Sequence, residues 1–125
     1  MINLKNILLV ILGSAAGGGL RYIISTIVQQ NTIGKFPMGT FTVNMLGCFL
    51  MGLILGIADK NSTTQLSFIL LLATGFCGGF TTFSAFAYEN INLLKNQLNL
   101  LALTYISLSV VVGILAVKWG MSIIK

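Results

Sequence analysis

The sequence predicts an all-α membrane protein with four transmembrane helices in each subunit. Of the 125 residues, 56% are apolar and only 7% are charged, whereas soluble domains average about 45–50% apolar and roughly 25% charged residues. Mean hydropathy is +0.98, and at about 20 residues per transmembrane helix the chain is long enough for four. This composition excludes a soluble globular domain. It also excludes a disordered chain, because there is ample apolar surface to bury.

The first half of the chain supplies two of the expected helices in a single domain, residues 1–125. The first span is expected at about residues 4–28, before a run of polar residues. The second is expected at about residues 39–58, directly after Pro37, which suits the first turn of a helix. Residues 59–64 are polar and predict a loop.

The second half supplies a long, interrupted span and a continuous one. The third span is expected at about residues 66–94, and the polar residues 95–97 separate it from the fourth, at about 98–124. The pair Gly78-Gly79 predicts a helix break at membrane depth. Unwound backbone at that depth must be buried in protein or line a cavity, and its free carbonyl groups could hold a hard cation.

The charges are few and scattered. The net charge of +5 comes from seven basic and two acidic residues, and no basic run indicates a nucleic-acid partner. With four spans, one side of the membrane holds Lys5, Lys60, Lys118 and Lys125, and the other holds Arg21, Lys35 and Lys95. Because orientation follows the bias in basic residues, a difference of one leaves two interpretations. Either a single charge sets one topology, or copies insert both ways and pair antiparallel.

Acid–base chemistry is nearly absent from the expected spans. The chain has no histidine, and Asp59 lies in a predicted loop. Arg21 lies inside the first span, where it either extends to the membrane surface or forms an electropositive vestibule. Glu89 is either its ion-pair partner or a solvated charge at the end of the third span. We therefore expect neither an enzyme nor a typical proton-coupled transporter.

Neutral hydrogen-bond donors remain at membrane depth. They occur on three spans, at Thr40 and Asn44, at Thr81, Thr82 and Ser84, and at Tyr105 and Ser109. Each alone could join two helices, but together they predict a polar track for an anion that sheds its water. Phe83 and Phe86 share a helical face, and the positive edges of their rings could flank a small anion. Simple packing is the alternative for both rings.

These residues resemble the Fluc/CrcB family of fluoride channels over essentially the whole chain. Four stretches carry the resemblance, namely Gly17-Gly18-Gly19-Leu20-Arg21-Tyr22, Gly39-Thr40-Phe41-Thr42-Val43-Asn44, Gly47-Cys48-Phe49 and the run from Gly75 to Phe86. The second stretch and Thr81-Thr82-Phe83-Ser84-x-Phe86 are the most specific. One departure is Ala85, where the family often has threonine, so one hydroxyl donor of the track is missing.

The resemblance implies an antiparallel, dual-topology homodimer in the lipid bilayer, with two fluoride pores. It places Phe83, Phe86 and Asn44 in the pore, and Arg21 near its mouth. It implies that the backbone carbonyl groups of Gly78 and Thr81, from both subunits, hold a structural sodium ion. The hydroxyl track then comprises Thr40, Thr82, Ser84, Tyr105 and Ser109.

The expected function is passive, electrogenic export of fluoride across the inner or plasma membrane of a bacterium, which gives fluoride resistance. The main alternative is a small multidrug exporter coupled to protons, because those proteins are also short, four-spanning and dual-topology. They depend on a buried glutamate in the first span, which this sequence lacks. A non-conducting assembly or lipid-binding subunit is a third interpretation.

Overall fold

The computed structural model describes residues 2–61 and 65–124, and every regular element in these ranges is helical. Four helical spans are long and apolar enough to cross a membrane. Three are continuous and one is divided, and their elements in chain order are α1 (Leu4–Gln30), α2 (Met38–Lys60), α3 (Leu66–Ile69), the π-helical segment η1 (Leu70–Cys77), α4 (Gly78–Phe80), α5 (Phe83–Lys95) and α6 (Asn99–Ile124). The expected four-helix fold with an interrupted third span is confirmed.

The helix ends follow local signals. The Asn3 side chain caps α1 by accepting a hydrogen bond from the backbone N–H of Asn6 at 2.8 Å. Pro37 precedes the first residue of α2, as expected. Asp59 and Lys60 belong to the last turn of α2 rather than to a loop, so that part of the loop prediction is wrong. The predicted loop residues 62–64 lie outside the described residues.

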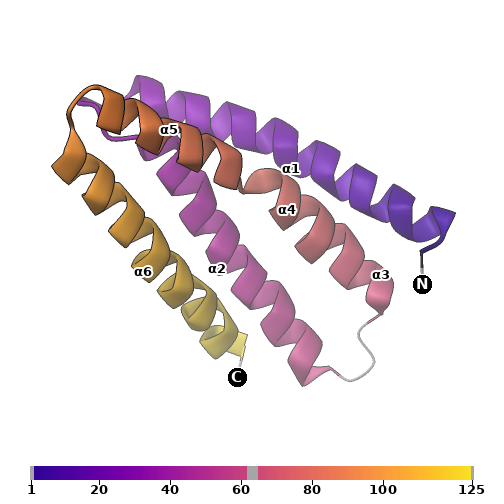
Figure 1. Ribbon diagram of the computed structural model, residues 1–125. Coiled ribbons are helices and arrows are strands. Elements are labelled where there is room, and N and C mark those ends of the chain that lie inside the picture. Colours follow the sequence, from indigo (N-terminus) through magenta and orange to yellow (C-terminus); the bar gives the residue numbers. More distant parts are fainter. Residues whose placement is uncertain (1, 62–64, 125) are drawn as a thin grey trace.

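The helices pack mainly in two pairs (Figure 1). α1 runs along η1 and α4, and α2 runs along α6. α5 contacts α6 near the end where the 31–37 and 96–98 connections lie. The start of α1 and the ends of α2 and α6 lie at the opposite end of the bundle. The third span therefore connects the two pairs.

Glycine permits the close approach within each pair. A β-carbon at Gly17 would overlap the carbonyl oxygen of Phe76, and one at Gly52 would overlap the carbonyl oxygen of Val117. Small residues that bring helix backbones together are the usual basis of packing in lipid, where apolar burial gives little driving force. The glycines of α1 and α2 thus fix how α1 meets the third span and how α2 meets α6.

The third span breaks at Thr81 and Thr82, not at the glycine pair. Gly78 is helical, with φ −61° and ψ −38°, whereas Thr81 and Thr82 are extended. Gly79 instead allows the backbone of Ser14 to approach. The Thr82 hydroxyl caps α5 by accepting a hydrogen bond from the N–H of Ala85 at 3.2 Å. The predicted break at Gly78-Gly79 is therefore wrong by about three residues.

Replacing Gly52 with alanine tests the close contact between α2 and α6. We expect Gly52→Ala to destabilise the fold by about 1–3 kcal/mol, because the methyl group meets fixed backbone. Thermal unfolding in detergent, followed by circular dichroism, measures the loss. Gly19→Ala is the matched control, since a β-carbon at Gly19 has no neighbour within 4 Å in the chain. Equal melting temperatures for the two variants would contradict the packing account.

Candidate functional site

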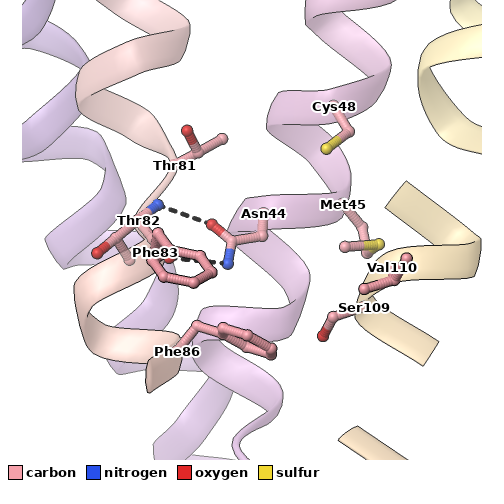
Figure 2. Close-up of a pocket in the computed structure, with 9 residues that line it drawn as sticks. All are labelled: Asn44, Met45, Cys48, Thr81, Thr82, Phe83, Phe86, Ser109 and Val110. Carbon is pink, nitrogen blue, oxygen red and sulfur yellow. Dashed lines mark hydrogen bonds between the residues drawn. The ribbon is translucent and has the colours of Figure 1, made fainter. Parts of the chain in front are cut away.

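The broken backbone of the third span is held by one side chain of α2. The N–H of Thr82 donates to Oδ1 of Asn44 at 2.8 Å, and Nδ2 of Asn44 donates to the Thr82 carbonyl at 3.1 Å. Figure 2 shows this pair of hydrogen bonds as dashed lines. Unpaired backbone groups are costly at membrane depth. Asn44 therefore supplies partners that the helix itself has lost.

A pocket of about 270 Å³ lies beside this amide pair, between α2, the break and α6 (Figure 2). It brings together six of the predicted site residues, and its full lining is Asn44, Met45, Cys48, Thr81, Thr82, Phe83, Phe86, Ser109 and Val110. Among these described residues none is charged. The polar groups of the pocket are therefore neutral hydroxyl and amide groups set in an apolar wall.

Two phenylalanine rings form part of that wall. The centroids of Phe83 and Phe86 are 5.6 Å apart, with 44° between the ring planes. Phe86 also meets Tyr105 in a T-shaped contact with a centroid distance of 5.0 Å. Phe83, by contrast, is 78% exposed in the single chain. One ring is therefore fixed by the fold, and the other is left uncovered at the surface of the subunit.

The hydroxyl groups near the pocket differ in their partners. The Oγ atom of Ser109 is buried and has no hydrogen-bond partner among the described residues. The hydroxyl groups of Thr82 and Ser84 lie 3.2 Å apart, with Ser84 exposed. Buried polar groups are normally hydrogen-bonded, so a hydroxyl of this kind can take water or an ion as its partner. Ser109 is thus free to donate into the pocket.

Thr40 and Tyr105 are engaged elsewhere. The Thr40 hydroxyl donates to Oε1 of Glu89 at 2.5 Å, and the Tyr105 hydroxyl donates to Oε2 at 2.7 Å. Tyr105 is fully buried. Glu89 was expected either to form an ion pair with Arg21 or to be a solvated charge, and neither is seen. No ion pair joins it to Arg21 among the described residues, and its carboxylate accepts hydrogen bonds from two side chains. The three residues together link α2, α5 and α6.

Arg21 lines a different pocket next to the break. It lines a smaller pocket, of about 210 Å³, together with Tyr22, Ser25, Thr40, Val43, Thr82 and Ala85. Its Nε atom is buried and lacks a hydrogen-bond partner among the described residues. Thr82 borders both this pocket and the main one. Arg21 is thus close to the break without lining the pocket that contains the phenylalanine rings.

At the break, the carbonyl groups of Gly78 and Thr81 lose the N–H donors that a continuous helix would give them. In a continuous helix the N–H of Thr82 would bond to the carbonyl of Gly78, but it bonds to Asn44. Likewise, the N–H of Ala85 bonds to the Thr82 hydroxyl instead of the Thr81 carbonyl. No cluster of three or more acidic, histidine or cysteine side chains could hold a metal in the described ranges. Backbone oxygens, which suit a hard cation, are what this region offers.

Comparison with known proteins identifies the family. A family described as "CrcB-like protein, Camphor Resistance (CrcB)" matches residues 8–121. A protein of Flavobacterium psychrophilum named "Fluoride-specific ion channel FluC" is 41% identical over 122 residues, which cover 98% of both chains. Proteins of the same name from Gloeothece citriformis and Leptospira interrogans are 43% and 45% identical. These matches cover 95% and 88% of this chain, and 96% and 87% of the relatives.

The family and the fold agree with each other. The printed names of the relatives describe ion channels and not enzymes. Four apolar helices of sufficient length accord with a protein that crosses the membrane several times. The matches also span the break and both phenylalanines of the pocket. The resemblance noted from the sequence motifs is therefore confirmed, and this multi-pass membrane protein belongs to the CrcB-like family.

Proposed function

We propose that this protein is a passive, electrogenic, fluoride-selective channel that exports fluoride and so gives fluoride resistance. The observation that carries the proposal is the uncharged pocket that gathers Asn44, Ser109, Phe83 and Phe86 at the break of the third span. The relatives also support the proposal. They are named fluoride-specific ion channels and are about 40% identical to this protein over nearly the whole chain. The protein is a channel and not an enzyme.

The chemistry of the pocket suits a small anion that has lost water. Hydroxyl and amide hydrogens replace hydration, and the positive edge of an aromatic ring adds attraction without a formal charge. A fixed cation in the same place would bind fluoride more tightly and slow its release. In this mechanism fluoride passes Asn44 and Ser109 and then the edges of Phe83 and Phe86.

The proposed functional unit is an antiparallel homodimer with two pores in the lipid bilayer. A single chain leaves Phe83 78% exposed, so its pore wall is incomplete. A two-fold axis would repeat any pore that two subunits complete together. The even distribution of basic residues favours insertion in both orientations. Bacterial relatives support location in the inner or plasma membrane of a bacterium.

A structural sodium ion is part of the proposal. The carbonyl groups of Gly78 and Thr81 would hold it, because their helical donors are used by Asn44 and Thr82. Gly78 is exposed in the single chain, so a second subunit could approach this residue. When bound, the ion would supply positive charge for oxygen atoms that lack hydrogen bonds.

The proton-coupled exporter remains the alternative from a different class. It requires a carboxylate in the first span, and α1 contains no acidic residue over Leu4–Gln30. It predicts proton exchange driven by an organic cation. A non-conducting packing subunit predicts no ion movement at all. Neither alternative is favoured by the family to which the chain belongs.

Fluoride efflux from liposomes tests the function. Purified protein is reconstituted in potassium fluoride, the vesicles are diluted into low potassium, and a fluoride electrode records release. We expect rapid efflux only after valinomycin is added, because an electrogenic channel needs a parallel path for charge. Efflux that ignores valinomycin, or none from a folded protein, would refute electrogenic fluoride conduction.

The phenylalanine rings provide the matching variants. Phe83→Ile and Phe86→Ile keep apolar volume but remove the ring edge, so each is expected to abolish efflux while the protein still assembles. Phe49→Ile is the control, because Phe49 packs on Trp119 with a centroid distance of 5.0 Å and does not line the pocket. Efflux at the wild-type rate in both pore variants would show that the ring edges of Phe83 and Phe86 are not needed for conduction.

Dual topology is testable with impermeant labels. Cysteine is placed singly at Asn31 or Asn61, which are exposed beyond opposite ends of α2, after Cys48 and Cys77 are replaced. We expect each position to be labelled from outside in about half of the molecules, because the difference of one basic residue sets no orientation. Complete labelling of one position and none of the other would establish a single orientation.

Sodium removal tests the proposed ion. We expect the melting temperature of the purified dimer to rise with sodium concentration and to fall when N-methylglucamine replaces sodium, because an ion bound only by the folded state stabilises it. Light scattering reports the oligomeric state in parallel. Identical melting in both salts would argue against a structural sodium ion.

A further inference from the structure

Two sulfur-containing side chains lie in the wall of the pocket at the break, and the proposed path of fluoride uses neither of them. Met45 and Cys48 are three residues apart on α2, so they lie on one face of that helix. Both line the pocket of about 270 Å³ (Figure 2). Cys77, the other cysteine of the sequence, is only 1% exposed and does not line it. A thioether and one thiol are therefore the sulfur ligands that the pocket offers.

The two side chains converge on the same place on α6. Gly113 has no side chain to fill that place, and a β-carbon built on it would lie 3.5 Å from Sγ of Cys48 and 3.5 Å from Cε of Met45. Cε is bonded directly to the sulfur of Met45. Because methionine has three rotatable side-chain bonds, its sulfur can turn towards Cys48 while the helix backbones stay in place. One small ion can therefore contact both sulfur atoms.

We propose that Met45 and Cys48 form a binding site for a soft, monovalent metal ion, and that the bound ion blocks the pore. Thiolate and thioether sulfur select soft ions such as Cu(I), whereas oxygen ligands suit hard cations. An ion at this site occupies the pocket that Asn44, Phe83 and Phe86 also line. The metal site goes beyond the proposed function, and only the block of fluoride rests on that function.

The charge balance of binding favours a monovalent ion. A metal–sulfur bond forms at Cys48 while the S–H bond breaks and its proton passes to water, because the thiolate is the form that binds metal. Met45 donates an electron pair and carries no charge. One thiolate cancels the charge of one monovalent ion, so no net charge is buried at membrane depth, where charge is costly. A divalent ion would leave one positive charge in the pocket.

A second feature of the same pocket supports a bound guest. The Oγ atom of Ser109 is buried and has no hydrogen-bond partner among the residues that the structure describes. Buried hydroxyl groups are normally hydrogen-bonded, so Ser109 can donate to a group that forms or binds beside it. The thiolate of Cys48 is an acceptor of this kind. The pocket thus combines space, two soft ligands and an unused donor.

Silver(I) is a suitable probe of the site because it is soft, monovalent and stable in air. Isothermal titration calorimetry with silver nitrate measures its binding to the purified protein. We expect a strong site that Cys48→Ala removes and that Met45→Leu weakens about tenfold or more. Cys77→Ala is the matched control, and it is expected to bind silver as the wild type does, since Cys77 does not line the pocket. Equal binding by the wild type and Cys48→Ala, or loss of binding in a folded Cys77→Ala, would overturn the proposal.

Fluoride efflux from liposomes tests the block. Nitrate replaces chloride in the buffers, because silver chloride is insoluble whereas silver fluoride dissolves. We expect silver to stop efflux through the wild type, and excess dithiothreitol to restore it by removing the ion. Cys48→Ala should keep the rate that it shows without silver. Undiminished wild-type efflux at silver concentrations that fill the site would overturn the block. A wild type that conducts no fluoride even without silver would instead refute the proposed function, while calorimetry still decides the metal site.

Discussion

The rest of this structure depends on the pair of hydrogen bonds between Asn44 and the backbone of Thr82. In lipid, every backbone N–H and carbonyl group needs a partner within the protein. A helix can therefore open at membrane depth only where another element of the protein, or water in a cavity, supplies those partners. Asn44 does so from the second turn of α2. The opening then frees the carbonyl groups of Gly78 and Thr81 from their helical donors, and it starts a new helix at Phe83.

The glycine contacts make that arrangement possible. α1 meets the third span, and α2 meets α6, with backbones so close that a methyl group at Gly17 or Gly52 would overlap a carbonyl oxygen. These contacts set the distances across which side chains of different helices meet. Two clusters of polar side chains lie on the same side of α2, one around Asn44 and one around Thr40. The first is neutral and open, and the second is occupied by the carboxylate of Glu89.

Much of the fold was predictable from sequence because lipid constrains it strongly. The lengths and apolar character of the spans followed from hydropathy. The family resemblance of the motifs placed Phe83, Phe86 and Asn44 in one pore, and all three line the same pocket. The break was misplaced because a Gly-Gly pair is typical of a flexible backbone, whereas here both glycines are helical and Gly79 permits close packing on Ser14 of α1. The partners of Glu89 had no local signal, since they lie 49 and 16 residues away on two other helices. The only local indication was that Glu89 lies one helical turn after Phe86.

Fluoride is proposed to be the ion that carries charge through the protein. Reversal potentials in a planar bilayer measure this directly, with opposing gradients of fluoride and chloride across purified protein. We expect a current that reverses at the equilibrium potential of fluoride, and a reversal potential that stays the same when the chloride gradient is changed. Reversal at the chloride potential, or a current carried by protons, would contradict this expectation.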